Sequence, residues 1–320
     1  MTKLAGDRGF VGHIGISRRA GSFHLAALRD PALPGNSDDW PWASVTKQVV
    51  ATIVMQQVAA GTLALDAPAA QYLPALGSEV AGPTLRQLLR HQSGLRNPDV
   101  SVADPAGLPS FYSTGATGLD WCLEGRIAPP ADRWVYNNCD YIVLGAILEK
   151  VTGQPIDRLM EESIARPAGM TGTRFLHPDD QRPFMGADTD YRTRLSRYGS
   201  AGGLVGPLED MVAFDRALLD GTLVSPSFRE QLWAGDPSLG GMALGSWEFR
   251  ALLAGCEAPV RIVERRGAIG HYQLRNLILP EQDLVLVLAT EDGDFAFDEI
   301  WTGTGFLHDV LSLAACGAGR

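Results

Sequence analysis

Residues 44–60 restrict the possible fold of this chain more than any other segment. Their pattern predicts a helix that is apolar on almost every side and ends at Gly61. Such a helix is normally buried in a sizeable core rather than placed on the surface. Lys47 lies in the first turn of this helix, where an ammonium without partners is costly to bury. Because only three of the 27 basic residues are lysines, the presence of this one needs an explanation.

Composition narrows the classes of protein to which the chain can belong. The 320 residues suffice for one large domain or two smaller ones, and 45% hydrophobic with 20% charged residues is typical of globular proteins. A net charge of −10 argues against nucleic acid or an anionic membrane surface as a partner. No run of about 20 apolar residues is free of polar interruption, so we expect no membrane span.

Two further expectations concern the compartment and metal binding. The first residues lack the long apolar run of a secretory signal, which favours a cytoplasmic protein, although a trimmed secreted chain would look the same. The four cysteines are far apart and are interpreted as reduced thiols. The six histidines show no ligand-like spacing, so we expect no metal and no cofactor.

The order of the predicted elements indicates an α+β fold, an α/β sandwich. Two short strands are predicted around a turn at residues 18–21, and strand-like runs follow at 243–252, 259–266, 269–279 and 284–290. Helical patterns fill the middle of the chain, and a closing helix is expected at 295–315. We therefore expect one antiparallel sheet built from both ends of the chain and flanked by helices, formed by residues 1–75 and 200–320. A mainly helical region at 76–199 is inserted, with the site in the cleft between the two.

Ser44 and Lys47 are one helical turn apart and point the same way. A serine hydroxyl becomes a good nucleophile when a base accepts its proton, and a lysine in a dry site can be neutral and serve as that base. The start of a helix also favours a developing oxyanion. In the alternative interpretation, Ser44 only caps the helix and the Lys47 side chain reaches out to solvent.

A second set of polar residues precedes an apolar helix in "RWVYNNCDYIVLGAILEKVTG". Tyr136 could move a proton beside a lysine if cationic neighbours lower its pKa. Asn138 is placed at the helix cap, where its amide could bond both the serine–lysine pair and a substrate amide. In the alternative interpretation, Asn138 only caps the helix and Tyr136 only packs.

The chain resembles the serine β-lactamase and penicillin-binding-protein family. The resemblance rests on "ASVTK", "LLRHQSGL", "YNNCDYIVLGAILEKVTG", "PAGMTGTRF" and "GSAGGLVGPLEDMVAFDRALLDG", which follow in the family's order between about residues 40 and 290. It is strongest to the class C β-lactamases and to the esterases and D-peptidases that share their fold. The resemblance implies an acyl-enzyme on Ser44, with Lys47 and Tyr136 moving its proton.

The family pattern also implies a Lys or His, any residue and then Gly on a strand that lines the site. Here the matching stretch is Arg265-Arg266-Gly267, and the resemblance implies that the backbone N–H groups of Ala268 and Ser44 form the oxyanion hole. Arg265 keeps the positive charge but cannot donate a proton in turnover. The alternative is His271, read as a remnant of His-x-Gly, and Arg265 would then pair with a surface acid.

Other polar residues are given secondary roles. His91 is interpreted as structural, and three arginines as either a solvated face or part of the cleft: Arg192, Arg194 and Arg197. Together these observations predict a serine hydrolase that cleaves a small ester, amide or β-lactam, most simply a carboxylesterase or amidase. A β-lactamase or D-Ala peptidase in the strict sense, and a non-catalytic binding module of the same fold, are the alternatives.

Overall fold

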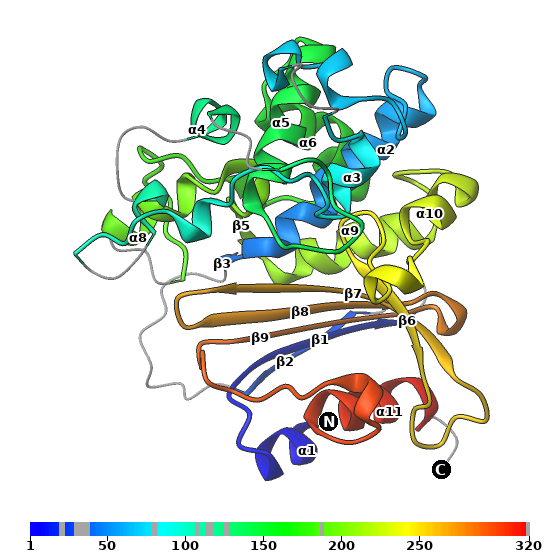
Figure 1. Cartoon of the computed structure of the whole chain (residues 1–320). Coiled ribbons are helices and arrows are strands. Elements are labelled where there is room, and N and C mark those ends of the chain that lie inside the picture. Colours follow the sequence, from blue (N-terminus) through cyan, green and yellow to red (C-terminus); the bar gives the residue numbers. More distant parts are fainter. Residues whose placement is uncertain are drawn as a thin grey trace.

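The computed structural model describes residues 1–18, 23–28, 39–77, 82–105, 109–112, 118–124, 128–185 and 189–317. A six-stranded sheet crosses the molecule, in the order β2-β1-β9-β8-β7-β6, with every neighbouring pair antiparallel (Figure 1). Its strands are β1 Gly12–Arg18, β2 Phe23–Leu28, β6 Trp247–Ala251, β7 Val260–Ile269, β8 Tyr272–Leu279 and β9 Leu284–Thr290. Because β1 pairs with β9, the sheet combines both ends of the chain, as predicted. The predicted turn after β1 lies outside the described residues from residue 19 onward.

Strand β9 shows why the sheet is a middle layer. All of its residues are buried, as expected for a strand covered on both faces. Side chains alternate between the two faces of a strand. Accordingly Val285, Val287 and Ala289 join the core on the side of the helical region. Leu284, Leu286 and Leu288 join a separate core with the terminal helices.

Helices cover both faces of this sheet (Figure 1). Helices α1 (Thr2–Asp7) and α11 (Phe306–Cys316) lie on one face, and the helical region lies on the other. The helices of that region are α2 Thr46–Ala59, α3 Leu85–Leu89, α4 Leu119–Leu123, α5 Asn138–Thr152, α6 Ile156–Met160, α7 Arg166–Ala168, α8 Thr189–Ser196, α9 Leu208–Leu219 and α10 Pro226–Leu232. A second sheet, in the order β3-β5-β4, lies beside them: Asp39–Pro41, Leu204–Pro207 and Arg174–Phe175. Within the described part of the chain, no helix combines the length and apolar character needed to cross a membrane.

Helix α2 is buried as its sequence predicts. Every residue from Thr46 to Met55 is buried, and the apolar residues of this helix belong to the core formed with α5, α9 and one face of the sheet. A short 3-10 turn, Ala43–Val45, leads into it. The helix therefore passes through the centre of the molecule and ends at Ala59, and Gly61 follows with a positive φ of 74°.

The cysteines correct the prediction of reduced thiols. Cys122 and Cys139 form a disulfide that joins α4 to the first turn of α5, and Cys256 and Cys316 form a second that joins the β6–β7 connection to the end of α11. Their partners are 17 and 60 residues apart in the sequence, and their Cα atoms are 5.4 and 5.2 Å apart in space. Only the tertiary packing of α4 on α5, and of α11 on the sheet, brings them together.

Candidate active site

Ser44 lies in the turn before α2 and is half-buried. Its carbonyl oxygen accepts a 2.8 Å hydrogen bond from the Nε of Arg265 on β7. The preceding residue, Ala43, has a positive φ of 46°, an uncommon backbone conformation for a residue with a side chain. A Cβ at Gly267 would lie 2.5 Å from the Trp42 carbonyl oxygen, so strand β7 approaches this turn more closely than any side chain would allow.

Lys47 is fully buried, and its Nζ contacts four oxygen atoms. Two of these are the carbonyl oxygens of the Asn138 amide at 2.7 Å and of Ala201 at 2.6 Å, which can only accept. The other two are the hydroxyls of Tyr136 at 2.8 Å and Ser44 at 3.1 Å. Since the two carbonyls occupy two Nζ protons, the remaining position on the nitrogen faces the two hydroxyls.

The charge state of Lys47 follows from this burial. Removal from water lowers its pKa well below the usual value, and the positive charge of Arg265 lowers it further. The carboxylates of Asp99 and Asp140 act in the opposite direction but do not offset the burial. A neutral amine has two donors and one lone pair, which matches two carbonyl acceptors and a pair of hydroxyls. The site therefore favours the form of lysine that can accept a proton.

The Tyr136 hydroxyl lies 2.5 Å from the Ser44 Oγ and 3.1 Å from the Asn138 Oδ1. The sequence predicted proton transfer by Tyr136 on the condition that cationic neighbours lower its pKa. Burial instead raises the pKa of Tyr136, although Arg265 and the hydrogen bond with Ser44 act against that rise. Tyr136 is thus a neutral phenol that can pass a proton on, rather than a resident phenolate.

Asn138 differs from its predicted position by one residue. The cap of α5 is Asn137, whose side chain accepts from the Cys139 N–H at 2.9 Å, and Asn138 is the first residue of the helix. The Asn138 Nδ2 faces both Asp99 oxygens at 3.1 Å and the Tyr112 hydroxyl at 3.0 Å. The contacts of Nδ2 therefore hold the amide with its carbonyl oxygen toward Lys47, and Nδ2 itself is already engaged.

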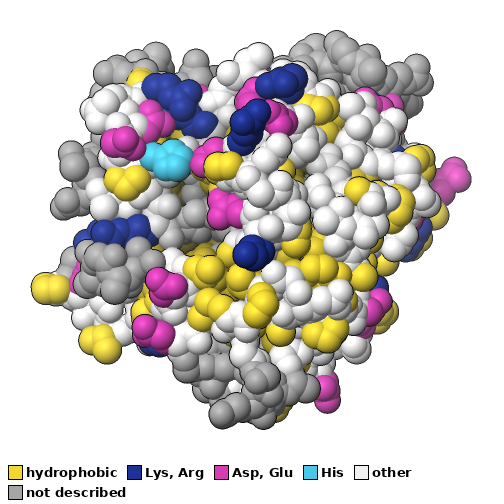
Figure 2. Space-filling model, turned by 90° about the horizontal axis from the view of Figure 1, so that it is seen from above, with side chains coloured by type: hydrophobic (Ala, Val, Ile, Leu, Met, Phe, Trp, Pro, Cys, Tyr) yellow, Lys and Arg dark blue, Asp and Glu magenta, His cyan; other side chains and the backbone are white. Residues whose placement is uncertain are grey.

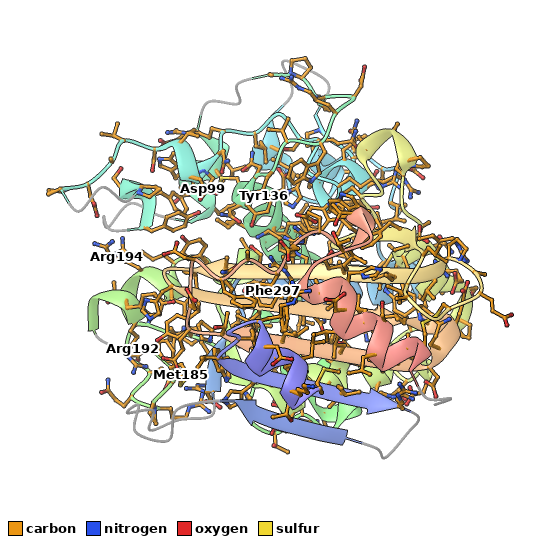
Figure 3. All side chains as sticks on the ribbon, turned by 90° about the horizontal axis from the view of Figure 1, so that it is seen from below. Asp99, Tyr136, Met185, Arg192, Arg194 and Phe297 are labelled. Atoms are coloured by element: carbon orange, nitrogen blue, oxygen red, sulfur yellow. A yellow bond between two sulfur atoms is a disulfide. The ribbon has the colours of Figure 1, made fainter. Side chains whose placement is uncertain are left out.

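Three further residues lie in the surroundings of Asn138, and the sequence did not indicate them: Asp99, Tyr112 and Tyr198. Tyr112 donates to Asp99 at 2.7 Å and stacks on Tyr198 with the ring centroids 3.9 Å apart. Figure 3 shows Asp99 and Tyr136 close together, with Arg194 of α8 nearby. Asp99 follows a turn signal, Asn-Pro, but nothing in that signal indicates a partner 39 residues later.

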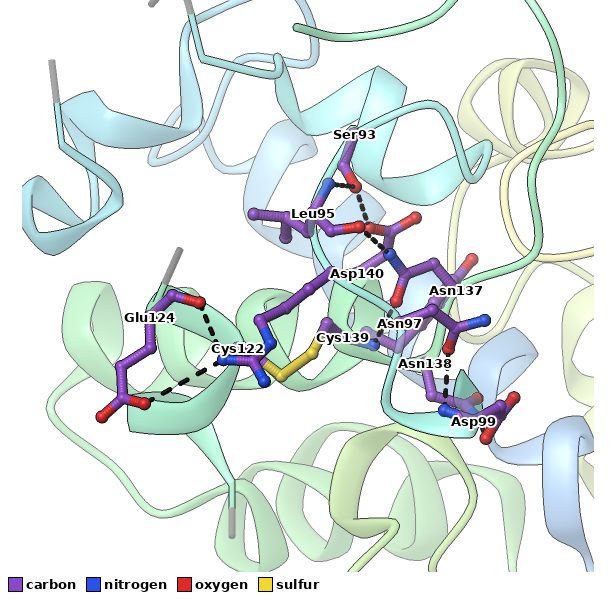
Figure 4. Close-up of a disulfide and its surroundings, with 12 residues drawn as sticks. Ser93, Leu95, Asn97, Asp99, Cys122, Glu124, Asn137, Asn138, Cys139 and Asp140 are labelled. Atoms are coloured by element: carbon purple, nitrogen blue, oxygen red, sulfur yellow. Dashed lines mark hydrogen bonds and ion pairs between the residues drawn. A yellow bond between two sulfur atoms is a disulfide. The ribbon is translucent and has the colours of Figure 1, made fainter. Parts of the chain in front are cut away.

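His91 is structural in its setting, as expected. It is fully buried, its Nδ1 lies 3.3 Å from both the Asp140 carboxyl and the Asn137 N–H, and its ring packs on Tyr136 at 4.8 Å. Burial lowers the pKa of His91 and raises that of Asp140, so burial favours the uncharged form of each side chain. Figure 4 shows Asp140 and Asn137 beside the Cys122–Cys139 disulfide. This cluster supports the segment that carries Tyr136.

Arg265, rather than His271, is the residue that the fold brings to Ser44. The Arg265 side chain is 1% exposed, and its Nη1 has no hydrogen-bond partner among the described residues. Two acids considered as its alternative partners pair with other arginines: the buried Glu264 with Arg266 at 2.8 Å, and Asp283 with Arg216 at 2.8 Å. His271 lies in the exposed turn between β7 and β8, where its ring packs on Tyr272.

Gly267 and Ala268 follow Arg265 on β7. Strand β6 pairs with β7 only as far as Trp247 opposite Glu264, so residues 265–269 have a strand partner, β8, on one side only. The Gly267 position faces the Ser44 turn, whereas the Ala268 side chain is exposed. The edge of β7 next to Ser44 is therefore open to an extended substrate.

Two of the three arginines that were candidates for the cleft have partners outside it. Arg194 pairs with Asp104 at 3.3 Å, and Arg192 donates to the Arg182 carbonyl at 3.1 Å. On the face seen in Figure 2, Lys and Arg side chains lie among Asp and Glu side chains without a continuous basic surface. Across the described ranges, no group of three or more His, Cys, Asp or Glu side chains is placed to hold a metal ion.

Comparisons with known proteins identify relatives of this chain. The chain is 32% identical over 197 residues to esterase EstB of Burkholderia gladioli, covering 55% of this chain and 50% of that protein. It is 28% identical over 232 residues to the putative penicillin-binding protein PbpX of Bacillus subtilis, covering 66% of this chain and 56% of that protein. The chain thus spans about half the length of these curated relatives.

Solved structures show the same fold. The D-amino acid amidase of Ochrobactrum anthropi SV3 superposes with a TM-score of 0.76 at 21% identity, covering 100% of this chain and 98% of that one. A D-stereospecific amidohydrolase from Streptomyces sp. gives 0.76 at 21% identity, covering 99% and 97%. The family model described as Beta-lactamase matches residues 21–301. Because this match spans most of the chain, the protein belongs to the β-lactamase family.

Proposed function

We propose that the protein is a serine hydrolase that cleaves a small ester or amide through an acyl-enzyme on Ser44. The observation that carries the proposal is the arrangement around one buried lysine. The Ser44 Oγ lies 2.5 Å from the Tyr136 hydroxyl and 3.1 Å from the Nζ of a Lys47 whose pKa is lowered by burial. A neutral amine beside a serine hydroxyl is what nucleophilic activation requires.

The first half of the reaction follows from these contacts. The Ser44 Oγ attacks the substrate carbonyl carbon, and its proton passes to the Lys47 Nζ, directly or through the Tyr136 hydroxyl. The carbonyl π electrons move onto oxygen, and the backbone N–H groups of Ser44 and Ala268 are the proposed donors to that oxyanion. When the oxyanion collapses, the bond to the leaving group breaks and the proton passes through Tyr136 to the leaving atom.

The second half restores the enzyme. Water attacks the acyl-enzyme carbonyl and loses its proton to the Tyr136–Lys47 pair. Collapse of this second oxyanion breaks the bond to the Ser44 Oγ, which takes the proton back and releases the carboxylic acid. Arg265 contributes positive charge and orientation only, since a guanidinium does not give up its proton in turnover. No cofactor enters any step.

Esters are favoured over β-lactams and D-peptides for a specific reason. The Asn138 Nδ2, which was expected to donate to a substrate amide, already faces Asp99 and Tyr112. A substrate that needs this donor would have to displace them and leave a buried acceptor unpaired. One relative carries a name that agrees with ester cleavage, the esterase EstB.

A serine-directed fluorophosphonate probe tests the proposal. We expect mass spectrometry to find the label on Ser44 and none on a folded Ser44→Ala variant. The same variant should lose hydrolysis of phenyl acetate, a D-amino-acid amide and a chromogenic cephalosporin. Labelling of Ser44→Ala at the wild-type level would refute the nucleophile. A cephalosporin turned over as efficiently as the best ester would favour the β-lactamase alternative, and no acylation at all would favour the binding module.

The two disulfides bear on the compartment. Disulfides persist in oxidising compartments and are rare in a reducing cytoplasm. In place of the cytoplasmic expectation, we propose that the folded protein works in an oxidising compartment. Thiol titration of the protein isolated from its native cells should find no free thiol without reductant. Four free thiols would support the cytoplasmic expectation instead.

A further inference from the structure

A cavity of about 590 Å³ lies at the edge of the main sheet, beside strand β6. Its volume is in the range of sites that bind small molecules, roughly 300–1,000 Å³. Its walls are mainly apolar and aromatic, and no step of the proposed reaction uses it. The lining residues are Trp134, Gly240, Trp247, Phe249, Arg250, Glu264, Arg266 and Trp301.

The charges in this cavity are already paired. Arg266 binds the Glu299 carboxylate at 2.5 Å and the Glu264 carboxylate at 2.8 Å. Arg250 forms an ion pair with Glu281. A charged ligand would therefore compete with existing ion pairs, whereas a neutral aromatic group would meet aromatic faces and edges. The chemistry of the walls suits a flat, uncharged, apolar group.

Two residues that line the cavity contact residues of the active site. Trp134 lies two residues before Tyr136, and their ring centroids are 6.2 Å apart. The Arg265 guanidinium lies over the Trp247 ring at 5.1 Å, and the same side chain donates to the Ser44 carbonyl. The two tryptophans are themselves 5.9 Å apart. These contacts place the two tryptophan rings next to Tyr136 and Arg265, within reach of a substrate that extends past Tyr136.

We propose that this cavity binds the leaving group of the substrate, and that the preferred leaving group is a fused or extended aryl alcohol. This inference rests on the proposed function. Tyr136 hands the proton to the leaving atom, so that atom must lie next to the Tyr136 hydroxyl. The group attached to it then lies next to Trp134 and points along Trp247 toward Phe249. The acyl group points the other way, along the open edge of β7.

The kinetic test compares esters that differ only in the size of the leaving group. Phenyl acetate and 2-naphthyl acetate have leaving groups of similar acidity, so their intrinsic reactivities are matched. Burial of a second ring in an apolar site should raise kcat/KM for the naphthyl ester about ten-fold over the phenyl ester. A second comparison of kcat/KM uses phenyl acetate and phenyl phenylacetate, which differ only in the acyl group.

Two substitutions in the cavity should remove that preference. Trp301→Ala and Phe249→Ala should bring the naphthyl-to-phenyl ratio of kcat/KM near one, because KM should rise more for the naphthyl ester than for phenyl acetate. Trp301 is 59% exposed, so its replacement should not unfold the protein even if that of Phe249 does. Leu252→Ala is the matched control, since Leu252 is also 59% exposed, follows β6 and does not line the cavity.

A binding measurement separates this inference from the proposed function. Calorimetry with the Ser44→Ala variant and 2-naphthol should show binding that Trp301→Ala weakens about ten-fold. Normal hydrolysis of phenyl acetate with a naphthyl-to-phenyl ratio near one would overturn the inference and leave the proposed function intact. Cavity variants that change the acyl series instead would also overturn it. If neither ester is hydrolysed but 2-naphthol binds, the proposed function fails while the cavity remains a binding site for aryl alcohols.

Discussion

Lys47 is a buried residue that must also act as a base. The folded protein stabilises it by two carbonyl acceptors and two hydroxyls, so the lysine is accommodated without an acid in direct contact. This arrangement explains both why the residue is tolerated in an apolar helix and why its pKa is low. Removing one acceptor should disturb the charge state of the lysine more than its position.

The first prediction concerns the pH dependence of hydrolysis. Because the base must be neutral and burial depresses its pKa, kcat/KM for phenyl acetate should rise as pH increases through the lowered pKa of Lys47 and then level off well below the usual lysine value. Lys47→Arg should be inactive throughout, since arginine stays protonated. A profile that keeps rising up to the ordinary lysine pKa would contradict this assignment.

The second prediction concerns Arg265. Its Nη1 is buried without a partner, which leaves one edge of a planar donor fork for a substrate carboxylate. Arg265→Ala should reduce kcat/KM for a carboxylate-bearing ester about ten- to hundred-fold relative to a neutral ester, the effect of losing about 1.5–3 kcal/mol. For the same ester, kcat/KM of Arg265→Lys should lie between that of the wild type and that of Arg265→Ala. Equal losses on both esters would assign Arg265 to support of the Ser44 backbone alone.

At the scale of single elements, α5 places the amide and the disulfide together. Asn138 and Cys139 are consecutive at its start, so the bond to Cys122 anchors the same turn that holds the Lys47 partner (Figure 4). The Cys122–Cys139 loop also encloses the segment with Trp134 and Tyr136. The disulfide should therefore support catalysis as well as stability.

The third prediction compares the two disulfides. Loop-closure entropy gives a stabilisation of about 3 kcal/mol for the 17-residue separation and about 4 kcal/mol for the 60-residue separation. Replacing each pair by serine should lower the free energy of unfolding in urea by about these amounts. Only the Cys122/Cys139 double variant should also lower kcat at a temperature where both variants are folded. A fall in kcat for the Cys256/Cys316 variant alone would contradict the link to α5.

The elements themselves were largely predictable from the sequence, whereas their contacts were not. The apolar pattern of residues 44–60 and the strand-like run at 284–290 are local signals, and the structure confirms both. The cap at Asn137 instead of Asn138 shows the usual error of one residue at a helix end. Asp99 behind Asn138 and the disulfides depend on loops meeting across the fold, which no local pattern encodes.

At the scale of the whole molecule, a buried polar cluster joins helices α2 and α9 to strand β8 of the main sheet. Asp215 of α9 accepts from Gln48 of α2 at 3.1 Å and from Asn276 of β8 at 3.0 Å. Its second oxygen, Oδ2, has no partner within the described structure. Burial raises the pKa of Asp215 well above its usual value, which favours the protonated carboxyl in the folded state.

The fourth prediction follows from that shift. A carboxyl whose pKa is raised by folding contributes stability below the unfolded value of about 3.9, and this contribution is lost as pH rises through the folded value. The wild-type protein should therefore lose stability relative to Asp215→Asn between pH 4 and pH 8. Urea unfolding of both proteins across this range measures the difference, with Asp120→Asn, an exposed aspartate on α4, as the control. A difference that stays constant with pH would show that Asp215 is ionised in the folded state.

The adjacency of β1 and β9 has a consequence for how the protein is made. Residues 13–18 cannot pair with 284–289 until those later residues have left the ribosome. Contacts between such distant segments slow folding, because a long loop must close before they form. During synthesis β1 and β2 are present without the strand that will lie between them and β8. The edge of β1 therefore stays unpaired until β9 has emerged, and a ribosome stalled before β9 should release a chain that aggregates.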